Sequence, residues 1–370
     1  MAKKKSEPRD TSAAPDEAAG GTATATAERA GPAAPAAAPA AAADGARGDA
    51  QLRHELLRSM LLQRRFEERT AEAYALGKIG GFCHLYIGQE AVSTGTISLL
   101  RDDDYIITTY RDHGQALARG MAPRAVMAEL FGRVDGVVRG KGGSMHLFDR
   151  NLNFLGGHGI VGGHVPIAAG VGFAIKYRGG DQVIICFMGE SVVNTGAFHE
   201  ALNMAALWKL PCVFIIENNR YGMGTALERA SSIHDIYERA SSYDMARAMV
   251  DGQDVFAVRG AVQEAIQRAR TEQLPTLLEM RTYRFMGHSM SDAVSGTYRT
   301  KAELDEHMKR DPIVLLRSQM QEAGEIDDAS VAKLDEELKA VVQDAWDFAD
   351  QSPEPPLEAL YEDVLVDTTT

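Results

Sequence analysis

From about residue 51, apolar residues recur every three to four positions, the pattern of a helix with one buried face. This stripe consists of Leu52, Leu56, Leu57, Met60, Leu61 and Phe66. A second stripe, close to the C-terminus, consists of Val331, Leu334, Leu338, Val341, Ala345 and Phe348. Between the stripes, Asp311 and Pro312 have the residue types of a helix N-cap and first turn. We expect both stripes to face the core or a subunit interface.

The most regular pattern runs from residue 183 to residue 219. Residues 183–188 (VIICFM) and 213–216 (VFII) are continuous apolar runs of strand length, typical of strands buried on both faces. Between them, Asn194 or Thr195 can cap a helix that Pro211 ends. A strand, a helix and a second strand predict a right-handed crossover between parallel strands. The predicted fold class is therefore α/β, with a mostly parallel central sheet flanked by helices.

Residues 81–180 are rich in glycine and lack a strong periodicity. The runs 140–143 (GKGG) and 156–159 (GGHG) indicate backbone that is held close to another group.

One alternative in this region is a nicotinamide-dependent Rossmann enzyme. Residues 157–162 (GHGIVG) fit the GxGxxG pattern, and Asp181 follows at a suitable distance. We disfavour this alternative because residues 151–155 (NLNFL) are too short and polar to be the strand that should precede the glycines. In addition, Asp181 begins a predicted strand, whereas a ribose-binding acid should end one.

The first 48 residues differ in composition from the rest of the chain. They contain no aromatic residue, and residues 31–45 are almost entirely alanine, proline and glycine. Such a segment cannot bury enough apolar surface to offset the entropy of ordering, so we predict a disordered tail at 1–48 and one domain at 49–370. The tail is either a solvated spacer or a tether to a large assembly. Glu7 and Asp10 disfavour a mitochondrial transit peptide, because such peptides are poor in acids.

Composition excludes several classes of protein. The formal net charge of -13 argues against a nucleic-acid-binding surface. No apolar run is long enough for a membrane span, and no secretory signal follows the basic residues 3–5. Cys83, Cys186 and Cys212 lie far apart without metal-ligand spacing, so we interpret them as buried small residues in a reducing compartment. The expected compartment is the cytoplasm.

Polar residues follow both strands of the predicted crossover. Glu190 comes after the first strand and Asn219 after the second, so a carboxylate, an amide oxygen and a loop carbonyl should meet at the carboxyl edge of the sheet. These hard oxygen ligands suit Mg²⁺ or Ca²⁺, and the helix that starts near Asn194 adds its positive end. From the residues alone, a metal-bridged diphosphate and a plain strand-end acid with a turn asparagine both stay open.

Blocks of distinctive sequence follow one another between about residues 60 and 315. They are FCHL (82–85), GQE (88–90), YR with HG (110–114), GKGGSMH (140–146), GIVG (159–162), NMAALWKLPCVFIIENNRYGMGT (203–225) and GHSMSD (287–292). In addition, Gly189-Glu190-Ser191 is followed, after 27 residues, by Asn219, which is similar to the thiamine-diphosphate signature Gly-Asp-Gly then Asn-Asn. Together these blocks resemble the alpha subunits of the thiamine-diphosphate-dependent 2-oxoacid dehydrogenase family, and imply its thiamine-diphosphate-binding fold.

The resemblance implies thiamine diphosphate and Mg²⁺ as cofactors. Glu190, Asn219 and the carbonyl of Tyr221 would hold the metal. The remaining cofactor contacts would come from Tyr110, Arg111, Gly159, Val161, Ser191, Val192 and His288. Of these, Gly159 and Val161 would hold the aminopyrimidine, and the others the diphosphate. His84 and His288 would face the reacting carbon, as proton donors or orienting groups.

The resemblance also implies a reaction and partners. The reaction is oxidative decarboxylation of a 2-oxoacid with transfer of the acyl group to a lipoyl group. Residues 203–211 (NMAALWKLP) and 218–225 (NNRYGMGT) favour pyruvate, with acetoin and branched-chain 2-oxoacids as alternatives. The glutamate that activates the cofactor lies on the beta subunit in this family. We therefore predict an α₂β₂ heterotetramer that feeds a dihydrolipoyl acetyltransferase, and a chain that is inactive alone.

Two departures from the family pattern affect the metal site. Glu190 stands where the family usually has aspartate, and Ser191 where it has glycine. Glutamate keeps the carboxylate, and serine predicts a negative φ at 191. A regulatory subunit that has lost metal binding is the remaining alternative. Residues 293–297 (AVSGT) also differ from the usual continuation, and the phosphorylation known at the serine matching Ser289 in mitochondrial relatives is not carried over.

Overall fold

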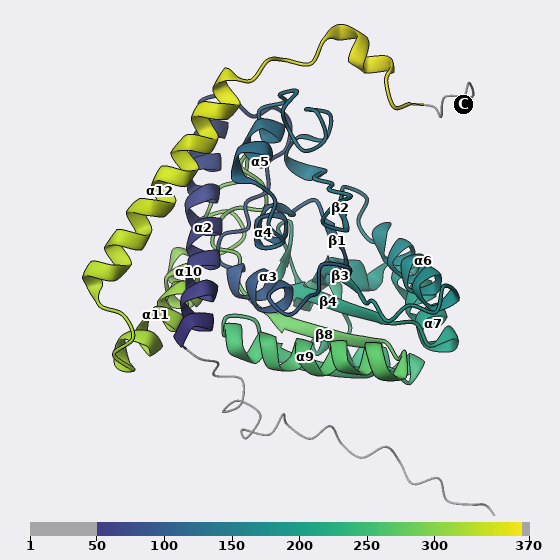
Figure 1. Ribbon diagram of the computed structural model, residues 1–370. Coiled ribbons are helices and arrows are strands. Elements are labelled where there is room, and N and C mark those ends of the chain that lie inside the picture. Colours follow the sequence, from purple (N-terminus) through teal and green to yellow (C-terminus); the bar gives the residue numbers. More distant parts are fainter. Residues whose placement is uncertain (1–49, 365–370) are drawn as a thin grey trace, which may run out of the picture. The chain divides into compact units, whose positions relative to one another are not determined.

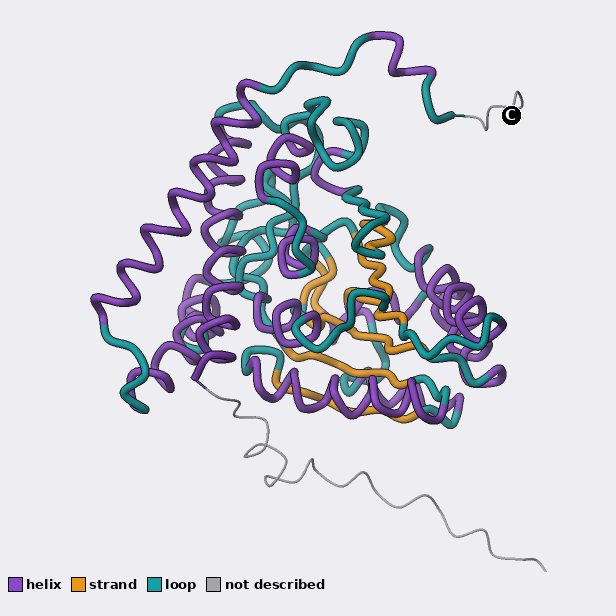
Figure 2. Tube along the Cα trace, viewed as in Figure 1, coloured by secondary structure: helices purple, strands orange, loops and turns teal. Residues whose placement is uncertain are grey.

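The computed structural model describes residues 50–364, so the predicted disordered tail at 1–48 lies outside the described part. Within it, one sheet has the spatial strand order β2-β1-β3-β4-β8-β7, and every neighbouring pair is parallel. The predicted α/β class is confirmed, and Figure 2 shows the strands as a central layer between helices. The strands are β1 (Tyr105–Thr109), β2 (Phe154–His158), β3 (Ile184–Gly189), β4 (Cys212–Asn218), β7 (Ala246–Asp251) and β8 (Thr276–Arg281).

Helices and short turns account for the other regular elements (Figure 1). The α-helices are α2 (Ala50–Ala75), α3 (Glu90–Ile97), α4 (His113–Ala118), α5 (Pro123–Leu130), α6 (His164–Tyr177), α7 (Gly196–Trp208), α8 (Leu227–Ala230), α9 (Val255–Glu272), α10 (Lys301–Met308), α11 (Pro312–Glu322) and α12 (Asp328–Gln351). The 3-10 helices are η1 (Gly143–Met145), η2 (Glu190–Asn194), η3 (Ile236–Tyr243) and η4 (Leu357–Tyr361), and a small hairpin joins β5 (Tyr221–Gly222) to β6 (Thr225–Ala226). Across residues 50–364, no helix combines the length and the apolar character that a membrane span requires.

The sheet is buried on both faces, as its continuous apolar strands predict. Ile184 and Cys186 of β3 belong to a core cluster with α6 and α7. Ile185 and Phe187, which alternate with them, belong to a cluster on the opposite face with α4 and α9. All three cysteines are free and buried, as predicted.

The predicted crossover β3-α7-β4 is confirmed. The Thr195 side chain accepts from the backbone N–H of Phe198, so Thr195 rather than Asn194 caps α7. The helix ends at Lys209, which is left-handed, two residues before Pro211. In the parallel pairing Gly189 lies opposite Glu217, so Glu190 and Asn219 leave the sheet at the same edge.

The helical stripe near the C-terminus is predicted correctly in extent but not in phase. The most buried positions of α12 are Leu338, Val342, Ala345, Trp346 and Ala349, whereas Val331, Leu334, Val341 and Phe348 are only half-buried. Helix α12 packs against α2 and α5, and Trp346 contacts Phe131 edge-on at 5.4 Å. Figure 1 shows α12 running beside α2. Because α12 packs against two helices at once, its buried face is not the face that carries the most apolar residues.

One prediction about the glycine-rich region is wrong. Residues 81–180 contain α3 to α6 as well as β1 and β2, although their periodicity is weak. Residues 154–158 also form a strand before the glycine loop, which the polar sequence 151–155 did not predict. Strand β2 lies at the edge of the sheet with β1 as its neighbour, a position that tolerates glycines within the strand.

Candidate active site

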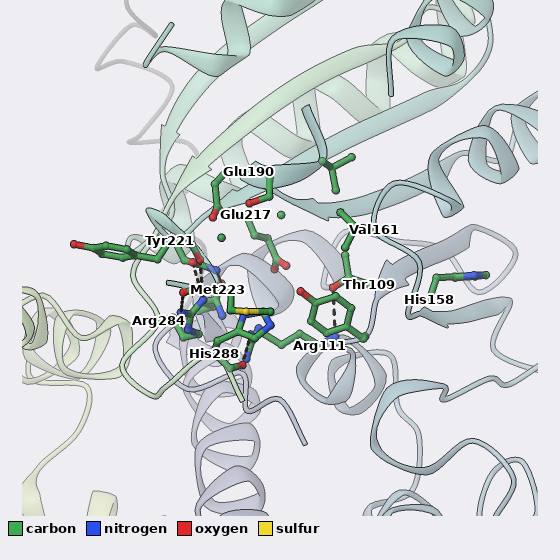
Figure 3. Close-up of a pocket in the computed structure, with 17 residues that line it drawn as sticks. Thr109, Arg111, His158, Val161, Glu190, Glu217, Tyr221, Met223, Arg284 and His288 are labelled. Atoms are coloured by element: carbon green, nitrogen blue, oxygen red, sulfur yellow. Dashed lines mark hydrogen bonds between the residues drawn. The ribbon is translucent and has the colours of Figure 1, made fainter. Parts of the chain in front are cut away.

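A cavity opens at the carboxyl edge of β3 and β4 (Figure 3). The predicted site residues that line it are Tyr110, Arg111, Val161, Glu190, Ser191, Val192, Asn219, Tyr221 and His288. His84 is buried directly behind this wall, with its ring 4.5 Å from that of Tyr110. Gly159 does not line the cavity and is exposed on the loop that carries Val161. The structure thus brings together nearly all of the predicted positions.

Glu190 is the acid at the sheet edge. It follows β3 directly and begins η2. Its side chain is buried and makes no salt bridge with any residue from 50 to 364. Burial raises the pKa of the Glu190 carboxyl, opposed by its own backbone amide and by the positive charge of Arg284. A buried carboxylate that faces a cavity without a contacting counter-ion favours a bound cation.

The turn after β4 directs further oxygens to this place. Arg220 (φ 75) and Met223 (φ 57) adopt the left-handed conformation that residues other than glycine rarely adopt. In this turn the carbonyl oxygens of Tyr221 and Met223 accept from the guanidinium of Arg284 at 3.2 and 3.4 Å. The same guanidinium donates to Oδ1 of Asn219 at 3.0 Å. A carboxylate, an amide oxygen and a loop carbonyl thus belong to residues that line one cavity.

Arg111, Tyr110 and His288 form another part of the wall, and the ring of His84 packs against those of Tyr110 and His288. The Arg111 guanidinium donates to the carbonyl oxygens of Leu85 at 2.6 Å and His288 at 2.8 Å. Burial, with the nearby charge of Arg284, lowers the pKa of Arg111 to about 10, so it stays protonated at neutral pH. The rings of His84 and His288 lie 5.1 Å apart, edge to face.

Both of these histidines are uncharged at neutral pH. Burial and then the charge of Arg111 lower the pKa of His84 to about 2 and that of His288 to about 4. The Nδ1 atom of each ring is buried without a hydrogen-bond partner among the described residues. Two neutral imidazoles with an unused nitrogen are suited to contact a polar ligand.

Several cavity residues were not predicted from the sequence. They are Gln89, Thr109, His158, Glu217, Gly222, Met223 and Arg284. Glu217 could have been found from the sequence, because an acidic residue at the end of a buried strand needs a hydrogen-bond or charge partner. It accepts from the Tyr86 hydroxyl and from Gln115 Nε2 at 3.1 Å, and burial raises its pKa to about 7. No spacing in the sequence connects Arg284 with the other site residues. His158 lines the cavity at some distance from the carboxylates, as Figure 3 shows.

The serine at position 191 has the backbone conformation predicted for it. Ser191 lies inside η2 and is not among the described residues with positive φ. Its hydroxyl occupies the space next to Gly222, where a Cβ added to that glycine would lie 1.9 Å from Ser191 Oγ. The Ser191 side chain therefore fits only because position 222 has no side chain.

The chemistry of the donors fits a divalent cation with a diphosphate. Glu190, Asn219 Oδ1 and the Tyr221 carbonyl supply three hard oxygens, a set that Mg²⁺ completes with water and phosphate oxygens. Arg111 adds a buried positive charge for the phosphates. Clusters of three or more histidine, cysteine or acidic residues that could hold a metal are absent from the described residues.

Comparison with known proteins agrees with this geometry. A family model described as dehydrogenase E1 component matches residues 58–358. The chain belongs to this family, which is thiamine-diphosphate-dependent in general. It is 47% identical over 310 residues to the pyruvate dehydrogenase E1 component subunit alpha of Rhizobium meliloti (strain 1021), covering 84% of this chain and 88% of that protein.

Other relatives carry similar names. The subunit alpha of the pyruvate dehydrogenase E1 component of Zymomonas mobilis is 47% identical over 314 residues, covering 84% of this chain and 88% of that protein. The chloroplastic subunit alpha-3 of Arabidopsis thaliana is 44% identical over 319 residues, covering 85% of this chain and 74% of that protein. The Rossmann alternative is excluded by this family membership.

Proposed function

We propose that this chain is the alpha subunit of a pyruvate dehydrogenase (acetyl-transferring). The observation that carries the proposal is the single cavity in which Glu190, Asn219, Tyr221, Arg111 and His288 meet at the carboxyl edge of the sheet. Relatives named as pyruvate dehydrogenase subunits support pyruvate as the substrate.

In this proposal Glu190, Asn219 and the Tyr221 carbonyl hold Mg²⁺. Tyr110, Arg111, Ser191, Val192 and His288 contact the diphosphate, and Gly159 and Val161 contact the aminopyrimidine. Thiamine diphosphate supplies the carbanion chemistry of decarboxylation when bound. The protein supplies charge, orientation and a site from which water is excluded.

The two neutral histidines would act on the substrate. Because the pKa values of His84 and His288 are depressed to about 2 and about 4, both imidazoles stay uncharged throughout the physiological range. Each can donate or accept one hydrogen bond at its free nitrogen, which suits orienting a carbonyl or passing a proton. Neutral rings also avoid adding charge beside Arg111.

The cavity supports the proposal of a beta partner. Its volume of about 220 Å³ is small for a complete cofactor site, which typically measures 300–1,000 Å³. Ile160 and Met223 are exposed beside it, at 78% and 62%. We place residues 49–370 in one cytoplasmic alpha-subunit domain of an α₂β₂ heterotetramer that passes acetyl groups to a dihydrolipoyl acetyltransferase.

The test is to co-express the chain with its candidate beta partner and to assay 2-oxoacid oxidation with an artificial electron acceptor. Pyruvate, acetoin and 3-methyl-2-oxobutanoate are compared, each with and without thiamine diphosphate and Mg²⁺. We expect cofactor-dependent oxidation with a clear preference for pyruvate. Preference for another substrate would correct the substrate only, whereas an inactive but well-formed tetramer would favour a regulatory subunit.

A further inference from the structure

Arg284 is a fully buried arginine whose guanidinium lies against the proposed metal ligands (Figure 3). Its Nη1 atom donates to Asn219 Oδ1 at 3.0 Å and to the Tyr221 carbonyl at 3.2 Å. The other partners of this side chain are Met223 O at 3.4 Å, Tyr298 Oη at 3.1 Å and Met286 O at 3.2 Å. A permanent positive charge is therefore bonded to two of the three oxygens that would hold the cation.

These contacts leave the ligand oxygens usable. An amide or carbonyl oxygen has two lone pairs, and Arg284 occupies one on Asn219 and one on Tyr221. The Asn219 amide is fixed in orientation, since its Nδ2 atom donates to Gln89 Oε1 at 3.3 Å. The guanidinium thus positions the two oxygens before any metal arrives, but it also lies close to the place where the metal must bind.

The charged groups that line the cavity give it no excess of negative charge. Two carboxylates, Glu190 and Glu217, face two guanidinium groups, Arg111 and Arg284. The imidazoles of the cavity wall add no negative charge. A divalent cation that arrives alone therefore meets a formally neutral site with a positive group in its second layer, and Coulomb repulsion opposes its binding.

We propose that Arg284 is a positioning residue that makes divalent-cation binding at Glu190, Asn219 and Tyr221 conditional on the diphosphate. The inference rests on the proposed function, which supplies the diphosphate. The negative phosphate oxygens offset the guanidinium, so metal and diphosphate bind as a pair and the metal alone binds weakly. Arg284 has this effect through its charge, and its hydrogen bonds keep the ligand oxygens in place.

The experiment measures Mn²⁺ binding to the cofactor-free complex of alpha and beta chains by the electron paramagnetic resonance signal of free Mn²⁺. The wild type is titrated alone, with thiamine diphosphate and with thiamine, which lacks the diphosphate. Arg284→Gln removes the positive charge, whereas the isosteric Asn219→Asp leaves Arg284 in place and adds a negative charge to one of the ligands. Arg284→Lys keeps the charge and serves as the matched control.

For the wild type we expect weak binding of Mn²⁺ alone or with thiamine, and binding tightened by about 100-fold with thiamine diphosphate. Arg284→Gln should tighten the binding of Mn²⁺ alone by about 10-fold or more, while Arg284→Lys should not, and Asn219→Asp sets the scale by showing how far an added anionic ligand tightens the same binding. A purely structural role of Arg284 predicts weaker or unchanged binding in Arg284→Gln, and that result would overturn the inference. Absence of Mn²⁺ binding even with thiamine diphosphate would instead count against the proposed function.

Discussion

At the scale of single residues, Glu190 is the only anionic group among the proposed metal ligands. Replacing it by alanine leaves two neutral oxygens beside Arg284, so we expect Glu190→Ala to lower the affinity for Mg²⁺ with thiamine diphosphate by more than about 100-fold. Glu190→Asp is the matched control, because it keeps the charge and shortens the side chain by one methylene. It should retain affinity to within about 10-fold, measured by isothermal titration calorimetry. Equal losses in both variants would contradict a ligand role for the carboxylate.

His113 gives the molecule a pH-dependent source of stability. It is fully buried, and its Nδ1 atom lies 2.9 Å from a carboxylate oxygen of Glu67. Burial lowers the pKa of His113, but the charge and hydrogen bond of Glu67 outweigh this and raise it to about 9. Because the folded value lies above the unfolded one, this stability is complete below about pH 6.5 and is lost as the pH rises through about 9.

The variant His113→Gln tests that contribution. It keeps a donor for Glu67 without a titratable charge, so the wild type should exceed it in free energy of unfolding by up to about 3 kcal/mol at about pH 6. This difference should shrink steadily between about pH 7 and pH 9.5 in urea unfolding experiments. A difference that stays constant over this range would show that His113 is not charged in the folded protein.

The site residues that could be predicted from the sequence are those that follow a strand or lie in a family block. Glu190 and Asn219 are examples, because strand ends are visible in the apolar pattern. Arg284 could not be found in this way. Its role depends on the left-handed turn at Arg220 and Met223, which brings main-chain oxygens to its guanidinium. Nothing in the local sequence reports that tertiary contact.

At the scale of elements, η2 and the β5-β6 hairpin are coupled through Ser191 and Gly222. A Cβ at position 222 would lie 1.9 Å from Ser191 Oγ and 3.1 Å from Ser191 Cβ. We therefore expect Gly222→Ala to destabilise the protein by about 1–2 kcal/mol. In a Ser191→Gly background the same substitution should cost about 1 kcal/mol less, measured by a double-mutant cycle of thermal unfolding. Additive effects would mean that the two residues do not touch.

The phase of α12 can be tested with two neighbouring valines. Val342 is 3% exposed in the core, whereas Val341, which belongs to the apolar stripe of the sequence, is half-buried. Val342→Ala should cost about 2 kcal/mol in the free energy of unfolding, and Val341→Ala less than about 1 kcal/mol. A larger loss of stability in Val341→Ala than in Val342→Ala would show that the face predicted from the sequence is the buried one.

The elements differ in how well the sequence predicts them. The crossover β3-α7-β4 is clear because its strands are buried on both faces and its helix has a cap at Thr195. The sequence does not predict α3, α4 and β2 clearly, because these elements are short. They also contain glycine or polar residues that are buried by tertiary contacts. Gly114, for example, packs so closely on Tyr86 that an added Cβ would lie 2.2 Å from its ring. Such packing overrides the weak local propensity.

At the scale of the whole molecule, helices α6 and α7 carry several exposed aromatic side chains. Phe173, Tyr177 and Trp208 form an exposed aromatic group, with ring centroids 5.5 Å apart between Phe173 and Trp208. Exposed apolar groups of this kind are more typical of subunits than of monomers. Together with the small cavity, this surface supports the proposed association with a beta chain.

The last prediction concerns the isolated chain. If the cofactor site is completed by a beta subunit, the purified chain alone should show no thiamine-diphosphate-dependent oxidation of pyruvate, and adding the beta chain should restore it. The matched control is Glu190→Ala in the complex, which keeps the association but lacks the anionic ligand. Full turnover by the isolated chain would contradict the partner requirement, because all reacting groups would then have to come from residues of this chain. Restoration by the beta chain in the wild type and not in the variant would assign the metal site to this chain and the missing wall to its partner.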